Sequence, residues 1–499
     1  MRYLLGVDAG TTSFKASLFN EDGALVSSAS GEYSLIVGDG LIEFEAEAYW
    51  GVFKDVVRRT LQSAGGVDKR DVKALAIDCQ GETMIVTDAA GRPLRNAIVW
   101  LDSRAVSEAE SIREAFGRQK VYEITGQNEI TGGWPASKIL WLKNNEKDVF
   151  RSAGKFMLLE DYLIFRLTGL FATEKSVQSS SLMLDIRKGV WWGEMLEFIG
   201  ITPNELPVLH EPGDYIGGVS AIAAQETGLS ANTAVVAGAL DQLAGVIGAG
   251  VVRPGLVSET TGTAMVLCTQ VESMPPYKAE NLAPCHYHAL KGKYCVLLWS
   301  PAAGLVLKWF KNSFYDGGVS YQKLDEEAAG IPAGSDGLLM LPHLCGANLP
   351  VYNASAKGVF YGITLAHTRA HFVRSVMESV AFMMRRNLEY LDGMGVHTSE
   401  LRLMGGGAGS RVWNGINADV TGKNVLIPKN TETACLGAAI LAGTGVGIFS
   451  SVEAACEKTI EIAQALRPDE ENLKAYQRYY EAYCRLDGSL DPIFSEISL

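Results

Sequence analysis

Short apolar runs separated by polar turns fill the first part of the chain, and they predict an α/β unit that opens with antiparallel strands. Apolar residues over 3–7 and 14–19 flank a Gly/Thr turn, which indicates two strands joined by a tight loop. The pattern then predicts a strand over 24–30, a helix over 46–64, strands over 72–78 and 84–87, and a helix over 104–116.

The second half of the chain opens with the same pattern. A buried strand over 233–238 runs into Asp241, and Gly and Pro residues between 245 and 255 indicate a flexible crossing. Strands over 256–259 and 264–268 then flank another Thr/Gly turn, and later elements are helices over 302–313, 367–394, 412–421 and 433–446 and a strand over 401–404. We therefore predict a duplicated α/β unit divided into residues 1–247 and 248–499.

Composition and charge narrow the class of protein. With 499 residues, of which 47% are hydrophobic, the chain can fill more than one core. A formal net charge of -13 removes the electrostatic case for binding nucleic acid or an anionic membrane. Asp8 comes too early for the apolar core of a signal peptide. We expect a cytoplasmic protein with no nucleic-acid or membrane partner, and a homodimer is one assembly that the sequence leaves open.

A first candidate site is the turn Asp8-Ala9-Gly10-Thr11-Thr12-Ser13. Its backbone N–H groups and hydroxyls suit a phosphate, and the Asp8 carboxylate suits a hydrated Mg²⁺. An ordinary glycine turn capped by Asp explains the turn equally well, since neither a Walker loop nor a GxGxxG fingerprint is present. The matching turn Thr261-Gly262-Thr263 at the head of the second half favours phosphate binding.

Two other segments are candidates for ligand contact. The glycines from Gly405 to Ser410 follow a strand and would let a flat ligand such as adenine approach the backbone, although a flexible strand-to-helix loop is the alternative. Asp241 ends a buried strand beside the glycine crossing, where a base could meet both a substrate and a nucleotide. A helix N-cap is the alternative for Asp241.

These elements together resemble the FGGY carbohydrate kinases, members of the actin, hexokinase and Hsp70 superfamily. Two long family signatures carry the resemblance, one from Gly133-Trp134-Pro135-Ala136-Ser137-Lys138 to Asn145 and one from Gly358-Val359-Phe360-Tyr361-Gly362 to Glu378. The resemblance covers essentially the whole chain. It implies two RNase H-like domains around a cleft, with the sugar side in 1–247 and the nucleotide side in 248–499. It also implies ATP and Mg²⁺ as cofactors, and a sugar or polyol hydroxyl as the phosphoryl acceptor.

The resemblance also implies a role for each matching position. Asp241 is expected to be the catalytic base and, with Asp8, to lie near the metal. Expected substrate-binding residues are Gln80, Glu82, Trp100, Asp102, Asp241 and Gln242, although a core Trp and a capped helix start explain Trp100 and Asp102 as well. Expected ATP-binding residues are Gly10, Thr11, Thr12, Ser13, Thr261, Gly262, Thr263, Gly405, Gly406, Gly407, Ala408 and Asn414.

The loop that begins at Gln80 bears on the substrate. Glycerol kinases carry an Arg-Glu pair and xylulose kinases a Met-His pair where this chain has Gly81-Glu82, so neither pattern transfers. Segments over 346–350 and 405–413 resemble xylulose kinases and favour a ketose such as xylulose, with erythritol, glycerol or another acyclic polyol as alternatives. An actin- or Hsp70-like ATPase or a sugar sensor without kinase activity is the alternative of another class.

Overall fold

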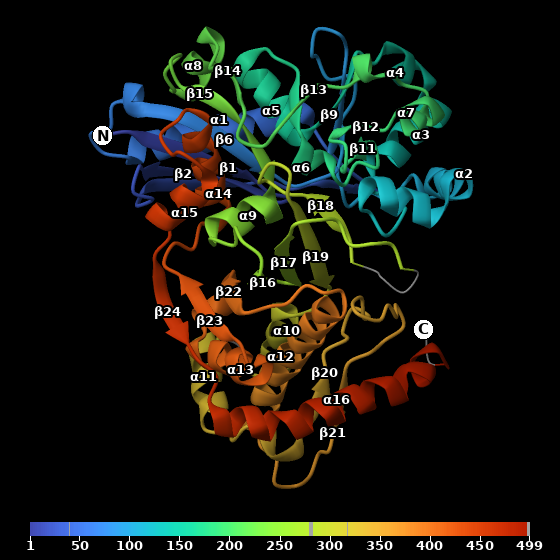
Figure 1. The fold of residues 1–499 in the computed structure, drawn as a ribbon, viewed down its shortest axis with the longest axis vertical. Coiled ribbons are helices and arrows are strands. Elements are labelled where there is room, and N and C mark those ends of the chain that lie inside the picture. Colours follow the sequence, from blue (N-terminus) through green and yellow to red (C-terminus); the bar gives the residue numbers. More distant parts are fainter. Residues whose placement is uncertain (39, 279–282, 317, 497–499) are drawn as a thin grey trace. The chain divides into compact units, whose positions relative to one another are not determined.

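The computed structural model of the protein describes residues 1–38, 40–278, 283–316 and 318–496. Its contacts divide the chain into two compact units (Figure 1). Unit 1 comprises Met1–Val252, Val271–Val296 and Glu432–Ile460, and unit 2 comprises Arg253–Gln270, Leu297–Thr431 and Glu461–Leu499. Among the helices of the described residues, none has the length and apolar character that would let it span a bilayer.

A six-stranded mixed sheet in the order β14-β15-β6-β1-β2-β3 forms the centre of unit 1. Its strands are β1 (Tyr3–Ala9), β2 (Ser13–Asn20), β3 (Leu25–Glu32), β6 (Val72–Cys79), β14 (Tyr215–Gly218) and β15 (Ala234–Leu240). β1 pairs antiparallel with β2, which confirms the predicted hairpin, whereas β1, β6 and β15 run parallel. The carboxyl ends of these three parallel strands therefore meet at one edge of the sheet.

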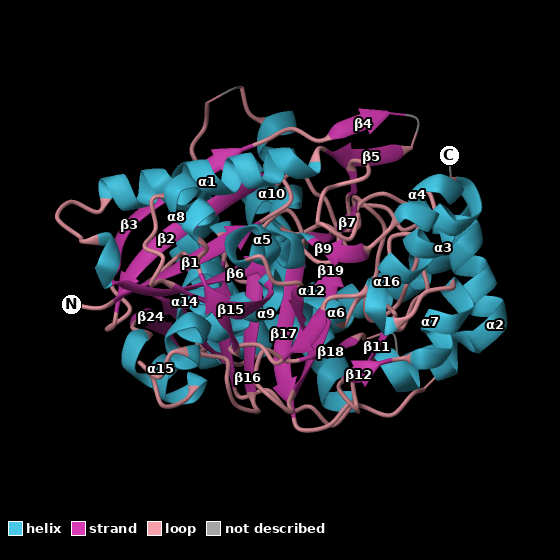
Figure 2. Cartoon of the chain, turned by 90° about the horizontal axis from the view of Figure 1, so that it is seen from above, coloured by secondary structure: helices cyan, strands magenta, loops and turns pink. Residues whose placement is uncertain are grey.

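Helices cover both faces of this sheet. Leu5 of β1 lies in one hydrophobic core with Trp50 and Phe53 of α1 (Ala46–Ser63), and Figure 2 shows α1 running alongside β2 and β3. Gly6, the residue after Leu5 in β1, faces the opposite side of the sheet from Leu5, because side chains alternate along a strand. There a Cβ on Gly6 would come within 1.8 Å of the carbonyl oxygen of Cys435 in α14 (Thr433–Gly445).

Unit 1 contains a second sheet and further helices. A five-stranded sheet has the order β4-β5-β8-β7-β9, with bounds Ile36–Gly38, Leu41–Phe44, Ala97–Ile98, Met84–Thr87 and Lys155–Leu158. The main helices are α2 (Val106–Thr125), α3 (Pro135–Asn145), α5 (Leu159–Thr168), α6 (Lys175–Gln178), α8 (Ala221–Thr227) and α15 (Val452–Thr459). α3 carries the first family signature, and it places that signature beside the loop that begins at Gln80.

The glycine-rich stretch after Asp241 begins as a helix, α9 (Asp241–Gly248), so Gly245 and Gly248 lie in a helix and not in the flexible crossing expected over 245–255. A Cβ on Gly248 would come within 1.8 Å of the Thr433 carbonyl oxygen, and one on Gly437 of α14 within 1.9 Å of the Ala244 carbonyl oxygen. The glycines therefore let α9 and α14 pack backbone against backbone, and close packing rather than flexibility accounts for them.

Unit 2 is built on a sheet in the order β19-β17-β16-β22-β23-β24. The strands are β16 (Leu256–Thr261), β17 (Met265–Val271), β19 (Tyr294–Ser300), β22 (Glu400–Met404), β23 (Asn424–Pro428) and β24 (Ile462–Leu466). The helices are α10 (Gly304–Phe314), α11 (Tyr321–Ala329), α12 (Arg369–Gly393), α13 (Arg411–Thr421) and α16 (Glu470–Glu496).

The two central sheets share one topology. The order β3-β2-β1-β6-β15 in unit 1 corresponds, strand for strand, to β19-β17-β16-β22-β23 in unit 2. In unit 1, β1 pairs antiparallel with β2 and parallel with β6, and β6 pairs parallel with β15. In unit 2, β16 pairs antiparallel with β17 and parallel with β22, and β22 pairs parallel with β23. The predicted duplicated α/β architecture is thus confirmed.

Candidate active site

Carboxyl groups gather at the edge where the parallel strands of unit 1 end. Asp8 on β1 lies opposite Asp78 on β6, and Asp78 lies opposite Ala239 on β15. Asp241 follows two residues later as the first residue of α9. The structure therefore brings together Asp8 and Asp241, as the sequence predicts, and adds Asp78 between their strands.

The electrostatics of this edge favour proton exchange near neutral pH. Burial and the charge of Asp8 raise the pKa of Asp241 to about 7. Burial likewise raises the pKa of Asp8 to about 6, and it raises the pKa of Asp78 well above its ordinary value. Burial thus favours the neutral form of Asp78, while Asp241 has the pKa range that suits a general base.

A β-bulge in β15, just before Asp241, sets the direction of the Asp241 side chain. Ala237 and Gly238 together oppose Ile77, because the pairing of β15 with β6 shifts between Val236 and Ala239. A Cβ on Gly238 would come within 1.8 Å of the Ile77 carbonyl oxygen, so only glycine fits the bulge. Bulges of this kind redirect the side chains that follow them.

Buried side chains hold the strand end after the bulge. The Gly238 N–H donates to Glu160 Oε1 at 2.9 Å, and the Leu240 N–H donates to Ser176 Oγ at 3.0 Å. Leu240 takes the N-cap position of α9 without a side-chain cap, and Asp241 is the first helical residue. The N-cap alternative for Asp241 is therefore not what the structure shows.

The first Gly/Thr turn is a closed loop with partners on two sides. The Gly10 N–H donates to the Ser13 carbonyl at 3.1 Å, and the Tyr33 hydroxyl donates to the Gly10 carbonyl at 2.5 Å. On another side, Trp100 Nε1 donates to Thr11 Oγ1 at 2.9 Å. The turn is thus held in one shape, as a phosphate loop must be, and Trp100 is brought to it.

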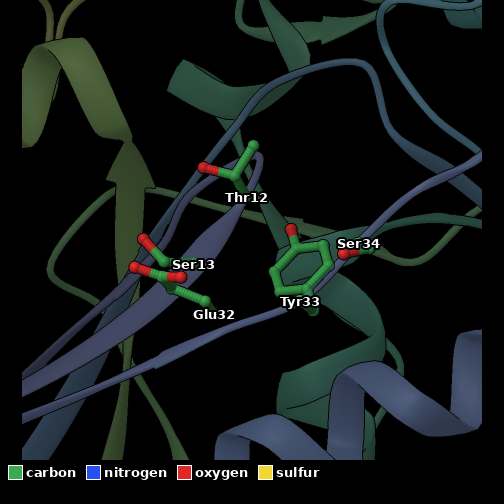
Figure 3. Close-up of a pocket in the computed structure, with 5 residues that line it drawn as sticks. All are labelled: Thr12, Ser13, Glu32, Tyr33 and Ser34. Atoms are coloured by element: carbon green, nitrogen blue, oxygen red, sulfur yellow. The ribbon is translucent and has the colours of Figure 1, made fainter.

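A hollow of about 390 Å³ adjoins the same turn and is lined by Thr12, Ser13, Glu32, Tyr33 and Ser34 (Figure 3). Ser13 and Glu32 are register partners on β2 and β3, and Figure 3 shows their side chains close together. The Glu32 carboxylate would repel a phosphate in this hollow. The centre of this hollow is therefore not where we expect a phosphate to bind.

Glu82, in the loop that begins at Gln80, has an unusual backbone conformation. Glu82 has φ 58, the left-handed region that non-glycine residues seldom adopt. Burial raises the pKa of Glu82, while the Ser180 hydroxyl and the Lys138 charge lower it. A Cβ on Gly81 would lie 3.0 Å from Leu240 Cδ1 and 3.2 Å from Ser180 Oγ, so a side chain at position 81 would require these neighbours to shift by a few tenths of an ångström.

Trp100 and Asp102 differ in how far they are free to contact a substrate. Trp100 is 39% exposed, so a face of its ring remains available for stacking. Asp102 is fully buried, and its carboxylate accepts from Arg104 Nε at 2.9 Å and from the Ile42 N–H at 2.6 Å. Because these partners occupy both oxygens, Asp102 supports the turn that carries Trp100.

In unit 2 the second Thr/Gly turn and the glycine loop after β22 lie against each other. A Cβ on Gly407 would come within 2.7 Å of Thr261 Cβ, and one on Gly405 within 2.8 Å of the Thr261 carbonyl oxygen. Asn414 Nδ2 donates to the Ala408 carbonyl at 2.8 Å and so fixes the loop. The expected nucleotide-binding positions are thus neighbours within one unit.

The second turn is anchored by the start of α10. The Ala303 and Leu305 N–H groups donate to the Thr263 carbonyl at 3.0 and 3.2 Å. A Cβ on Gly304 would come within 2.3 Å of the Gly262 carbonyl oxygen. The turn therefore rests on backbone contacts that require a small residue at the helix start.

Glu259 is buried on β16, and its ionisation should make the stability of the folded protein depend on pH. It accepts a hydrogen bond from the Thr261 hydroxyl, and burial raises its pKa to about 8. The unfolded chain ionises a glutamate above about pH 4.3, so folding loses stability as pH rises from there to about 8. Glu259→Gln should therefore melt at the wild-type temperature near pH 4.5 and increasingly above it toward pH 8.5. A thermal-shift series over pH would show the widening gap, and a constant gap would refute this account.

Several residues of this site were not among those expected from the sequence: Asp78, Lys138, Glu160, Ser176 and Glu259. The available signal was a polar residue inside an apolar run, as for Asp78 in Ala76-Ile77-Asp78-Cys79 and Glu259 in Val257-Ser258-Glu259. Neither run reveals which face of its strand is buried. Lys138 lies within a quoted signature, but its burial depends on contacts with distant segments.

Comparison with known proteins agrees with this geometry. The N-terminal domain model of the FGGY family of carbohydrate kinases matches residues 3–248, and the C-terminal domain model matches residues 258–446. The xylulose kinase of Bacillus subtilis is 31% identical over 97% of this chain and 96% of its own length. The gluconokinase of the same organism is 28% identical over 99% and 98%. The crystal structure of xylulose kinase from Rhodospirillum rubrum has a TM-score of 0.89, 28% identity, and coverage of 99% and 100%. The chain therefore belongs to the FGGY family of carbohydrate kinases.

Proposed function

We propose that this carbohydrate kinase transfers the terminal phosphoryl group of ATP to a hydroxyl of a ketose, with xylulose the first candidate and Asp241 the general base. The observation that carries the proposal is the edge of unit 1 where Asp8 on β1 and Asp241, directly after β15, lie on either side of β6 at the carboxyl ends of parallel strands. The loop of Glu82 begins there too, because the Gln80 N–H donates to the Ala9 carbonyl at 3.1 Å.

Asp241 is proposed to accept the proton of the attacking hydroxyl. Phosphoryl transfer has a loose transition state, so positioning and charge stabilisation supply most of the rate. The turn from Gly10 to Ser13 and the turn Thr261-Gly262-Thr263 are proposed to hold ATP phosphates, and Gly405 to Ala408 the adenosine. Asn414, whose Nδ2 donates to the Ala408 carbonyl, is proposed to bind the adenosine with them. The sugar side is thus assigned to 1–247 and the nucleotide side to 248–499.

Asp8 and Asp241 are the residues proposed to hold Mg²⁺. The described residues include no group of three His, Cys, Asp or Glu side chains placed to hold a metal by themselves. Two carboxylates nevertheless fit Mg²⁺, which is commonly bound by one or two carboxylates together with substrate phosphates and waters. When bound, the ion would neutralise charge on the transferring phosphoryl group.

The substrate assignment rests on the groups around Glu82. Its carboxylate can accept hydrogen bonds from two hydroxyls, and the exposed Trp100 ring can stack on a carbon chain. Both features suit an uncharged ketose or acyclic polyol. Three carboxylates, those of Asp8, Glu82 and Asp241, would oppose the carboxylate of an aldonate such as gluconate.

A panel of purified substrates tests this proposal. ADP release should be fastest with xylulose or another ketose, slower with erythritol and glycerol, and slowest with gluconate. Gluconate as the best substrate would overturn the assignment, and ADP release that never depends on an added sugar or polyol would favour a sensor or ATPase.

Glu82→Gln tests the role of the substrate loop. A hydrogen bond to a charged group contributes about 1.5–3 kcal/mol, so its weakening should raise KM for the sugar about 10-fold or more. KM for ATP should stay within about twofold, because Glu82 lies on the proposed sugar side. Steady-state kinetics with each substrate varied in turn measure both constants, and equal changes in the two would contradict a role in sugar binding.

A further inference from the structure

Lys138 is a buried lysine to which the proposed mechanism gives no role. It lies in α3 with none of its surface exposed. Its Nζ donates to the carbonyl oxygens of Glu82 and Val99, each at 3.0 Å. Burying an ammonium group is costly unless it is well paired, and an apolar residue would fill the same space without that cost. We therefore attribute the presence of a lysine at this position to its hydrogen bonds with these two carbonyls.

The two carbonyls belong to the two segments that form the proposed sugar side. Glu82 carries the substrate carboxylate on a left-handed residue, and Val99 directly precedes Trp100. A second bond joins the same segments, because the Trp100 N–H donates to Thr83 Oγ1 at 3.1 Å. Left-handed backbone at a non-glycine residue persists only where its surroundings hold it. The Lys138 bond to the Glu82 carbonyl is such a restraint.

We infer that Lys138 is a positioning residue that sets the spacing between the Glu82 carboxylate and the Trp100 indole, and so determines which sugars the enzyme accepts. This inference rests on the proposed function. Lys138 acts through backbone carbonyls and not by contact with the reacting atoms. Its effect should therefore fall on sugar affinity and selectivity, and not on nucleotide binding, whose expected residues beyond the first turn lie in unit 2.

The test compares Lys138→Met with Lys143→Met. Lys143 lies on the same helix and donates to the Phe198 carbonyl at 3.4 Å, away from the proposed site, so it is a matched control. Lys138→Met should raise KM for the best sugar at least 10-fold, leave KM for ATP within twofold, and reduce the ratio of kcat/KM between that sugar and its epimer. Lys138→Arg, which keeps a cation and several donors, should fall between wild type and Lys138→Met. Lys143→Met should leave all three quantities unchanged.

An unchanged sugar KM in folded Lys138→Met, or equal rises in both KM values, would overturn the inference. If Lys138→Met fails to fold, Thr83→Val tests the inference in its place, because it removes the hydrogen bond from the Trp100 N–H that also joins the two segments. A selective rise in sugar KM for Thr83→Val supports the inference, and unchanged constants refute it. Wild-type enzyme that phosphorylates no sugar or polyol would instead refute the proposed function, so the two failures are distinguishable.

Discussion

Asp241→Asn is expected to lower kcat for sugar phosphorylation by about 10²- to 10⁴-fold, the usual contribution of a general base. Asparagine keeps the size of the side chain and can still accept from the Gln242 N–H, which lies 2.6 Å from Asp241 Oδ1. It cannot take a proton from the attacking hydroxyl. Coupled ADP-release kinetics with saturating sugar and ATP measure the loss.

Two controls separate loss of the base from loss of the fold. Asp148→Asn makes the same substitution in the first turn of another helix of unit 1, α4 (Lys147–Ser152), on an exposed side chain, and should leave kcat unchanged. The melting temperature of Asp241→Asn should equal or exceed that of wild type, because desolvation and the charge of Asp8 raise the pKa of Asp241 and so disfavour its carboxylate in the folded protein. Near-normal kcat in a folded Asp241→Asn variant would show that another group accepts the proton.

Gly437→Ala is expected to destabilise unit 1 strongly. The added Cβ would come within 1.9 Å of the Ala244 carbonyl oxygen, a backbone atom that moves only if α9 shifts away from α14. Overpacking of this kind costs about 1–3 kcal/mol or more, and α9 begins with the catalytic candidate Asp241. Both the apparent melting temperature and kcat should therefore fall.

Gly415→Ala is the matched control for that substitution. Gly415 lies inside helix α13, and a Cβ there would meet no atom within 4 Å. Alanine in a helix interior is favoured over glycine by about 0.5–1 kcal/mol, so this variant should melt at or slightly above the wild-type temperature. Equal behaviour of the two variants in a thermal-shift assay would show that the α9–α14 contact is not the reason for the glycine.

The sequence predicts those parts of the fold that depend on local patterns of apolar and turn residues. The apolar runs on either side of each Thr/Gly turn predict both hairpins, and the repeated pattern predicts the duplicated topology. Asp8 and Asp241 could be found because each ends such a run. Gly245 and Gly248 were misread as a flexible crossing, because a packing glycine and a loop glycine are identical in a single sequence.

The rest of the site depends on contacts between segments distant in the chain. Lys138 meets Glu82 across 56 residues, and Glu160 meets Gly238 across 78. No local pattern reveals that such charges are buried or which carbonyl they serve. The same limit applies to Asp102, which was expected to accept substrate hydroxyls, whereas its oxygens are taken by Arg104 and the Ile42 N–H.

The most direct test of the central claim is the stoichiometry of product formation by the purified wild-type protein with ATP, Mg²⁺ and xylulose. Mass spectrometry and ADP quantification should show one phosphorylated sugar for each ADP released, and neither product should accumulate when the sugar is omitted. ADP accumulating at the same rate without any sugar or polyol, with no phosphorylated product across the panel, would contradict the account.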